Sequence, residues 1–481
     1  MACRNSVDQP SNRFGLKMCC IETRLILISF AILLTCTNGA FAQAPQPSLD
    51  ELIAVVKGED SIKSAAAITA IGKRKPTSDL AIQTLVDALA DDRRAVGASN
   101  YVFHSFPVAT VGSTAADALA EIGKPAVPRL REFITKHDNM AVRRLAIRSL
   151  AKMQGDAAEA LPTLERLLGD PQVEIRFEAV AALVAVQRDP RSLSSVLGTV
   201  LSDKSPDVRA AAIRALGDLG ESGARHVPHL LKLLDDPASR WQFYTPDMAM
   251  PYPVRHDAAR ALAGIGKDGR VALAKLREMM NGDANSLVRI AAAFAVAKLD
   301  DAPQDAMEYL IAAVQDDEKG YGGLEAAAES LGKLGPQAKA ALPALGDALK
   351  HPETMVRIHA VGAIVAISPE TAESRVLPML KDEDALVRAS AIENLGSLRQ
   401  ASPQLLRSYI AALDDSDDIF GEDVRHAAAV ALGNLGEQAT AAVPRLTSMA
   451  QEEESEWLKK AARESLRQIT PGPTKTNKTK Q

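Results

Sequence analysis

Apolar residues recur along this chain at helical spacing, and nearly the same helix returns from one end to the other. In residues 205–220 the apolar side chains fall at i, i+3, i+4, i+7, i+8 and i+11, which is one stripe of an α-helix. Similar stretches begin at Met355, Leu386 and Asp423. An amphipathic helix repeated in this way predicts stacked structural units rather than unrelated domains.

Alignment on the Val of a recurring Val-Arg pair gives twelve units, most of them 31 to 34 residues apart. The aligned positions are Ile62, Val111, Val142, Ile175, Val208, Val254, Val288, Leu324, Val356, Val387, Val424 and Leu458. Each unit is expected to hold two helices. Helix A is often entered at a proline, and helix B begins at the Val-Arg pair and ends near a glycine.

Proline and glycine mark the ends of these two helices. The prolines that open helix A are Pro128, Pro162, Pro228, Pro343 and Pro444. The glycines that close helix B are Gly72, Gly123, Gly220, Gly266, Gly335 and Gly436. Proline suits the first turn, where its missing N–H costs nothing, and glycine suits the left-handed residue after the last turn.

An aspartate about five residues before the Val-Arg pair completes the pattern, as in Asp170 before Ile175-Arg176 and Asp203 before Val208-Arg209. This pattern resembles the HEAT-repeat family, specifically the short HEAT-like repeats of the phycobilisome-lyase type. The resemblance covers about residues 49–470 and implies an all-α fold, an α-solenoid (superhelix) of about twelve HEAT-like helix pairs. It does not specify a function, because this scaffold is shared by many activities.

A basic residue follows the aligned apolar residue in ten of the twelve units. Eight of these are arginines in the regular pattern: Arg143, Arg176, Arg209, Arg255, Arg289, Arg357, Arg388 and Arg425. A row of arginines can bind anions. Repetition at one structural position instead favours an Asp–Arg ladder between adjacent units, in which each guanidinium pairs with a turn carboxylate or carbonyl.

The repeat is interrupted in the turn between helix A and helix B. The gap from the turn Asp to the aligned Val is normally five residues, but it is 19 after Asp92 and 18 after Asp236. The residues expected to bind a partner there are Tyr101, Phe103, His104 and Phe106 in the first insertion and Trp241, Phe243, Tyr244, Met248, Met250 and Tyr252 in the second. Long aromatic loops on a regular scaffold are typical binding elements. The alternative, which stays open, is that they pack back onto their own scaffold.

The N-terminal segment has the pattern of a secretory signal peptide. An apolar run at 25–36 is too short to span a membrane and is followed by an Ala-Phe-Ala site ending at Ala42. The expected organisation is a signal peptide at 1–42, a linker at 43–48, the solenoid at 49–470 and a disordered tail at 471–481. We therefore expect export to the periplasm or the extracellular space, with no transmembrane helix in the mature chain. Lipidation at Cys36 or an uncleaved anchor is the alternative.

Composition narrows the chemistry of the mature chain. All four cysteines lie in residues 1–42, so no disulfide or thiolate ligand is expected after cleavage. The mature chain would hold 52 basic and 59 acidic residues, a net charge of −7. This balance does not favour nucleic acid as a partner, because phosphate binding needs a concentrated basic face.

Motifs of catalysis and metal binding are weak. The Gly-x-Gly-x-x-Gly match at 264–269 follows a predicted helix rather than a strand, so we interpret it as a helix cap. No His-Glu dipeptide is present, although metal-dependent hydroxylases of HEAT-like fold use such pairs. His226 and His229 are spaced to chelate but lack an obvious third ligand, and His256 and His426 lie five repeats apart. The acidic run at 414–423 could hold calcium, but a solvated turn is the simpler interpretation.

These patterns predict an exported, non-catalytic binding or scaffold protein without a cofactor. Another protein would be the partner, contacted through the concave helix-B face and the aromatic insertions. The alternatives are a lyase-like or metal-dependent hydroxylase-like HEAT enzyme and an envelope-anchored structural protein.

Overall fold

The structure, a computed structural model, describes residues 46–95, 109–241, 251–316, 321–417, 421–453 and 455–470. These residues form helices and one short β-hairpin, and they divide into two compact units. The described part of the first unit runs from residue 46 to Ala212, and that of the second from Ile213 onward. Within the described ranges, no helix is long and apolar enough to cross a membrane.

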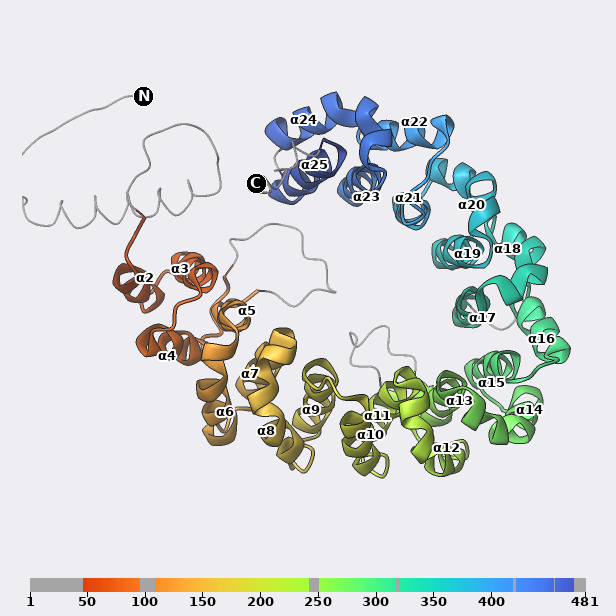
Figure 1. Ribbon diagram of the computed structural model, residues 1–481, viewed down its shortest axis with the longest axis horizontal. Coiled ribbons are helices and arrows are strands. Elements are labelled where there is room, and N and C mark those ends of the chain that lie inside the picture. The colour runs from red at the N-terminus through yellow and green to blue at the C-terminus, as the bar shows by residue number, and fades with distance from the viewer. Residues whose placement is uncertain are drawn as a thin grey trace, which may run out of the picture. The chain divides into compact units, whose positions relative to one another are not determined.

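In the first unit, successive helices pair and stack in two rows (Figure 1). The helices are α2 (Leu49–Val56), α3 (Ser61–Arg74), α4 (Asp79–Ala88), α5 (Val111–Ile122), α6 (Val127–Lys136), α7 (Met140–Met153), α8 (Leu161–Leu167), α9 (Val173–Val186), α10 (Pro190–Thr199) and α11 (Pro206–Asp218), which crosses the boundary between the units. α3, α5, α7 and α9 contact one another in sequence and are B helices. Short 3₁₀ turns η1 (Lys124–Ala126) and η2 (Gln154–Ala160) lead into α6 and α8.

The second unit continues the same pattern. Its A helices are α12 (Val227–Leu233), α14 (Leu273–Gly282), α16 (Gln304–Val314), α18 (Leu342–Ala348), α20 (Pro369–Val376), α22 (Pro403–Ala412) and α24 (Val443–Glu452). Its B helices are α13 (Val254–Ile265), α15 (Ser286–Leu299), α17 (Tyr321–Leu334), α19 (Thr354–Ile367), α21 (Ala385–Gly396), α23 (Gly421–Asn434) and α25 (Glu456–Ile469). The hairpin strands are β1 (Ser239–Trp241) and β2 (Pro251–Pro253). The 3₁₀ turns are η3 (Gly220–His226), η4 (Lys267–Ala272), η6 (Gly335–Ala341), η7 (Leu377–Lys381) and η8 (Gly436–Ala442). Figure 1 shows the B helices of this unit on the concave side of their own stack. The all-α solenoid of helix pairs predicted from the sequence is confirmed.

Local signals explain where the helices begin and end. All five predicted prolines lie in the first turn of α6, α8, α12, α18 and α24. Asp60, Asn139 and Asn285 cap B helices by accepting hydrogen bonds from backbone N–H groups of the first turn. The five other predicted glycines have positive φ, but Gly72 does not. It lies inside α3, and Lys75 takes the left-handed position after that helix, so the prediction for Gly72 was wrong.

Small residues let adjacent B helices approach closely. A Cβ added to Gly72 would lie 2.8 Å from Cα of Ala118 on α5, and one added to Gly217 would lie 2.7 Å from Cα of Ala261 on α13. Since real Cβ contacts are longer than this, glycine at these positions is a packing requirement. The core is built mainly from Ala, Leu, Ile and Val on both helices of each pair.

The structure corrects the sequence alignment at two units. Ile62, expected at the buried Val position, is 53% exposed. Counting from the N-caps Asp60 and Asn139, Lys63 is the residue equivalent to Val142. In α17 the buried residues Ala327, Ala328, Leu331 and Leu334 match Ala146, Ile147, Leu150 and Met153 of α7. The same offset puts Gly323 rather than Leu324 at the position of Val142. The error at Leu324 follows an irregular turn, and the error at Ile62 lies in the first helix pairs. In both places the regular repeat spacing does not fix the alignment.

Candidate interaction surface

The arginines of the Val-Arg pairs are held by carboxylates of the following turn. Arg176 and Asp203 form a two-pronged pair, with 2.8 Å from Nε to Oδ2 and 2.8 Å from the second nitrogen to Oδ1. The same Arg176 donates to the carbonyl oxygen of Asp170 at 3.1 Å. Equivalent pairs are Arg143 with Asp170 (2.6 Å), Arg255 with Asp283 (2.7 Å), Arg357 with Asp382 (2.8 Å), Arg388 with Asp415 (2.8 Å) and Arg425 with Glu453 (3.0 Å).

The remaining two ladder arginines also donate to the scaffold. Arg209 donates to the carbonyl oxygens of Asp203 and Lys204. Arg289 donates to the carbonyl oxygen of Asp283 and to the hydroxyl of Tyr309. Burial raises the pKa of Asp203, but hydrogen bonds from Arg176 and from the Ser205 backbone outweigh it and hold the pKa below its usual value. The guanidinium groups are therefore engaged by the scaffold itself, which leaves little of them for a bound anion.

Paired backbone segments form the base of both long insertions. β1 and β2 are antiparallel, with Arg240 opposite Tyr252 and Trp241 opposite Pro251. At the first insertion, the N–H of Ala95 donates to the carbonyl of Ala109 at 2.8 Å, and the N–H of Val111 donates to the carbonyl of Arg93 at 2.9 Å. Each base leads directly into a B helix, α5 or α13. Both insertions thus leave the scaffold at the same place in the repeat.

Of the ten predicted binding residues, the structure describes two, Trp241 in β1 and Tyr252 in β2. Tyr101, Phe103, His104, Phe106, Phe243, Tyr244, Met248 and Met250 lie outside the described residues. The Tyr252 ring meets the His256 ring edge-on, with 5.5 Å between centroids. His256 and Asp257 are both buried, and Nδ1 of His256 lies 3.4 Å from Oδ1 of Asp257. A tyrosine, a histidine and an aspartate therefore support the base of the second insertion.

The metal-binding and phosphate-binding candidates can be placed as well. Gly266 ends α13 with a positive φ and Gly269 lies in η4, so the Gly-x-Gly-x-x-Gly match is a turn after a helix, as predicted. In the acidic run, Asp414 pairs with Arg445 at 2.6 Å and Asp415 with Arg388 at 2.8 Å. Residues 418–420 of that run lie outside the described part. Among described residues, no three His, Cys, Asp or Glu side chains are grouped so that they could hold a metal ion.

One surface of the second unit was not found from the sequence. On its B helices, Trp457 of α25 stacks on His426 of α23, with 4.0 Å between ring centroids and 7° between ring planes. Trp457 is 44% exposed, and Val430 on α23 is 40% exposed. Burial raises the pKa of Glu393 on α21, and the charge of Asp423 raises it further. The sequence did hold one signal for this surface, its scarcity of positive charge. α19, α21 and α23 each carry a single Lys or Arg, and in each helix that residue is the ladder arginine.

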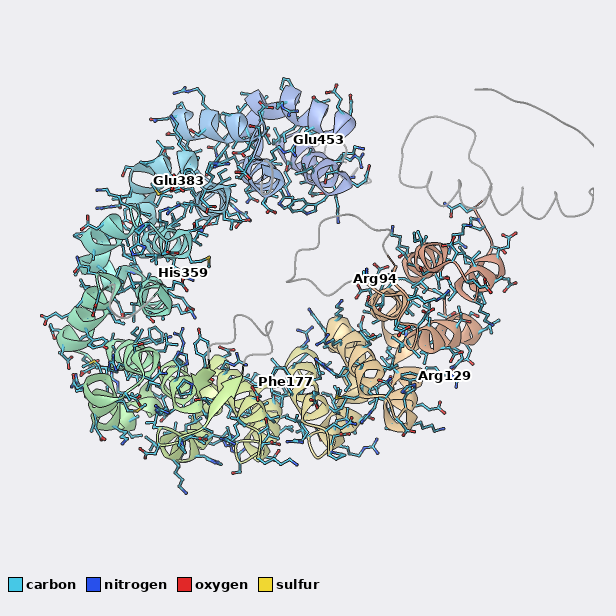
Figure 2. All side chains as sticks on the ribbon, turned by 180° about the vertical axis from the view of Figure 1, so that it is seen from behind. Arg94, Arg129, Phe177, His359, Glu383 and Glu453 are labelled. Carbon is cyan, nitrogen blue, oxygen red and sulfur yellow. The ribbon has the colours of Figure 1, made fainter. Side chains whose placement is uncertain are left out.

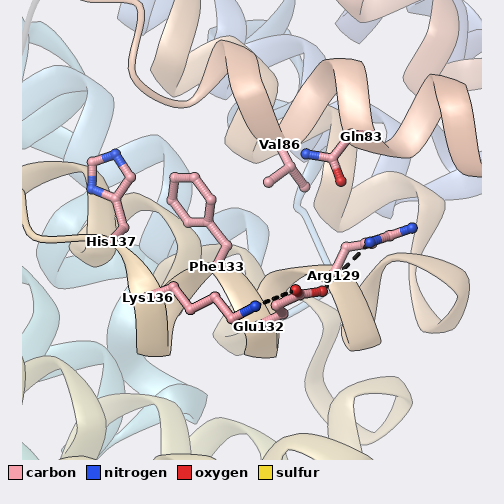
Figure 3. A pocket seen from close by; sticks show the side chains of 7 residues that line it. All are labelled: Gln83, Val86, Arg129, Glu132, Phe133, Lys136 and His137. Carbon is pink, nitrogen blue, oxygen red and sulfur yellow. Dashed lines mark hydrogen bonds and ion pairs between the residues drawn. The ribbon is translucent and has the colours of Figure 1, made fainter.

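Two hollows lie elsewhere on the structure. One of about 210 Å³ lies between α4 and α6 in the first unit (Figure 3). The rings of Phe133 and His137 stack at its edge, and Lys136 pairs with Glu132 at 2.8 Å. The other, of about 590 Å³, lies beside the hairpin base and is lined by Asp235, Asp236 and Glu278 among others. Neither brings together a nucleophile and a base, so neither indicates catalysis.

Similarity to known proteins agrees with this architecture. The chain is an α-solenoid repeat protein, and the family of HEAT repeats matches residues 108–184, 170–242, 322–396, 342–421 and 373–467. Because these matches cover more than half of the sequence, the chain belongs to the HEAT-repeat family, as its residues predict. No curated protein matches the chain significantly.

Several solved structures are similar to the chain at low identity. Yeast importin-beta (Kap95p) is 14% identical over 93% of this chain and 66% of its own, with a TM-score of 0.47. The CpcE–CpcF complex of phycocyanin lyase from Nostoc sp. PCC7120 is 21% identical over 57% of this chain and 97% of its own, with a TM-score of 0.26. Human deoxyhypusine hydroxylase is 21% identical over 58% of this chain and 96% of its own, with a TM-score of 0.27. These similarities concern the fold alone.

Proposed function

We propose that this protein is an exported scaffold that binds another protein through its B-helix face and its two aromatic insertions. The proposal rests on the position of the insertions. Both leave the scaffold through paired backbone at the entry to a B helix, so both emerge on the same edge of the repeat. Seven of the 15 aromatic residues in 43–481 lie in these two insertions. Aromatic side chains on loops of a rigid scaffold are typical of protein interfaces.

The proposal of a non-catalytic role rests on the contacts of the arginines, the histidine and the aspartate described above. The ladder arginines are engaged by carboxylates and carbonyls. The histidine–aspartate pair at the hairpin base is buried beneath a tyrosine ring. The sequence also lacks the His-Glu dipeptides that metal-dependent hydroxylation would require.

The test removes the insertions while keeping their bases. Replacing 96–108 and 242–250 with two-residue Asn-Gly turns would close each antiparallel base without disturbing α5 or α13. A matched control keeps both insertions and carries Glu308→Gln and Asp347→Asn on the A helices. Each version is used as bait in crosslinking capture from exported and envelope fractions, with circular dichroism to confirm folding.

We expect the control to capture the same partner as the unaltered chain and the shortened version to lose it. Equal capture by the shortened version would assign binding to the helices alone and remove the insertions from the account. If no version captures a protein, the scaffold proposal is wrong.

A further inference from the structure

Most basic side chains on the B helices α17 to α25 are already paired. Lys333 of α17 pairs with Glu329, and on α25 Lys459 and Arg463 pair with Glu456 and Arg467 with Glu464, whereas Lys460 has no such pair among the described residues. α19, α21 and α23 each contain one basic residue, Arg357, Arg388 and Arg425. Each of these pairs with a carboxylate of the next turn at 2.8 to 3.0 Å. These three helices therefore present no Lys or Arg that is free to neutralise acids on their exposed sides.

Three carboxylates on the face formed by α17 to α25 make no ion pair with Lys or Arg among the described residues: Glu325 on α17, Glu393 on α21 and Asp423 on α23. The charge of Asp423 acts on His426, where it opposes the lowering of the histidine pKa by burial. Burial raises the pKa of Glu325, and His359 (labelled in Figure 2) offsets this only in part. The neighbouring Glu329 differs, because it lies 3.6 Å from Arg260 and 2.5 Å from Lys333. A carboxylate that is partly desolvated and unpaired is a favourable site for an incoming cation.

Apolar side chains lie among these acids. Seven large apolar residues are exposed in the described part of the chain, and three of them lie on this face: Met355 on α19, Val430 on α23 and Trp457 on α25. Trp457 is held by its stack on His426, so its exposed side is a fixed platform. Ordered, exposed apolar groups beside unpaired charges mark an interaction surface rather than an ordinary solvated face.

We propose that the acidic-apolar face, formed by Glu325, Met355, Glu393, Asp423, Val430 and Trp457, binds an extended segment of a partner protein that carries lysine or arginine together with apolar side chains. This inference rests on the scaffold function proposed above. Charge complementarity selects the occupant. The three unpaired carboxylates outnumber Lys460, the one Lys or Arg of these B helices for which the described residues show neither an ion pair nor a ladder contact. Neighbouring helix axes lie about 8–10 Å apart and an extended chain advances about 3.3 Å per residue. Basic residues spaced roughly six and three positions apart would therefore reach the carboxylates of α17, α21 and α23 in turn.

The test uses random 12-residue peptides displayed on phage and selected on the full chain, followed by fluorescence anisotropy with the best synthetic peptide. The charge-removing variant is Glu325→Gln/Glu393→Gln/Asp423→Asn. The matched control, Glu308→Gln/Asp347→Asn/Glu437→Gln, removes the same number of carboxylates from α16, α18 and η8. A version ending at Thr470 is included because the tail contains Lys475, Lys478 and Lys480. Circular dichroism checks that each version folds.

Selection on the unaltered chain and on the control should enrich peptides with lysine or arginine beside aromatic or aliphatic residues. The charge-removing variant should bind the selected peptide about tenfold or more weakly, because three charge contacts are lost. Enrichment without basic residues, or equal affinity for the charge-removing variant, would overturn the proposal. Binding that appears only after truncation at Thr470 would make the chain's own tail the occupant and would overturn it as well.

Failure of this inference can be told apart from failure of the proposed function. A native partner captured equally well by the unaltered chain and the charge-removing variant would leave the scaffold function intact and remove this face. A chain that selects basic peptides but captures no native protein would contradict the scaffold function instead.

Discussion

Substituting Asp203→Asn should be far more damaging than an ordinary polar change, because it leaves a buried guanidinium without its charge partner. The Arg176 side chain is 4% exposed and that of Asp203 is 9% exposed. The substitution removes the charge from a pair with two 2.8 Å hydrogen bonds, although an amide oxygen can still accept one of them. Breaking a buried pair by removing one partner typically costs about 3–5 kcal/mol. Because one hydrogen bond remains, we expect a loss of about 3 kcal/mol.

The effect should be local, because each unit of a repeat array contacts only its neighbours. Native-state hydrogen exchange of α9 and α10 therefore measures it better than a single unfolding midpoint. The control is Glu159→Gln, which breaks the exposed Lys124–Glu159 contact at 3.4 Å and should cost less than about 0.5 kcal/mol. The double variant Arg176→Met/Asp203→Leu should recover most of the loss, since no buried charge remains.

A loss below about 1 kcal/mol for Asp203→Asn, or a loss in the double variant equal to that in the single one, would refute this reasoning. Either result would mean that the ladder is tolerated by the fold without contributing to its stability.

Three other predictions follow from the same contacts. Gly217→Ala should destabilise the second unit by about 1–3 kcal/mol, because the new Cβ would lie 2.7 Å from Cα of Ala261. Gly346→Ala has open space around it and should stabilise the protein by about 0.5–1 kcal/mol. Urea unfolding measures both changes, and similar effects at the two sites would contradict the packing argument. Folding lowers the pKa of Asp203, so its contribution to stability is present above the unfolded pKa of about 3.9 and is lost as pH falls through the lower folded pKa. The difference in stability between the unaltered chain and Asp203→Asn should therefore be full at about pH 6 and small towards about pH 2. A difference that grows in acid would contradict this sign. N-terminal sequencing of exported protein should begin at Gln43, and a blocked or lipidated Cys36 would support anchoring instead.

The repeat made much of the fold predictable. Helix pairs, proline entries and the glycine turns at Gly123 and Gly436 follow from local chemistry repeated at a fixed period. The pairing of Arg176 with Asp203 could be anticipated because both residues recur at one position of the unit. The insertion bases were less accessible, since two prolines in three residues at 251–253 do not resemble a strand.

Other features depend on neighbours that the sequence does not show. Ile62 lies one residue before the position equivalent to Val142 and is exposed, and the spacing of the first helix pairs did not show this register. Gly72 is needed inside α3 because Ala118 packs against it, a contact between residues of neighbouring helix pairs. The acidic-apolar face becomes visible only when the ladder arginines are known to be occupied, because Arg357 and Arg388 would otherwise seem to neutralise Glu393.

Crosslinking mass spectrometry of the chain with its captured partner tests the central claim most directly. Lysines lie on both sides of the second unit: Lys298, Lys333 and Lys460 on B helices, and Lys232 and Lys275 on A helices. We expect crosslinks to the partner from the B-helix lysines and few from the A-helix lysines. Crosslinks confined to Lys232 and Lys275 would contradict binding through the B-helix face.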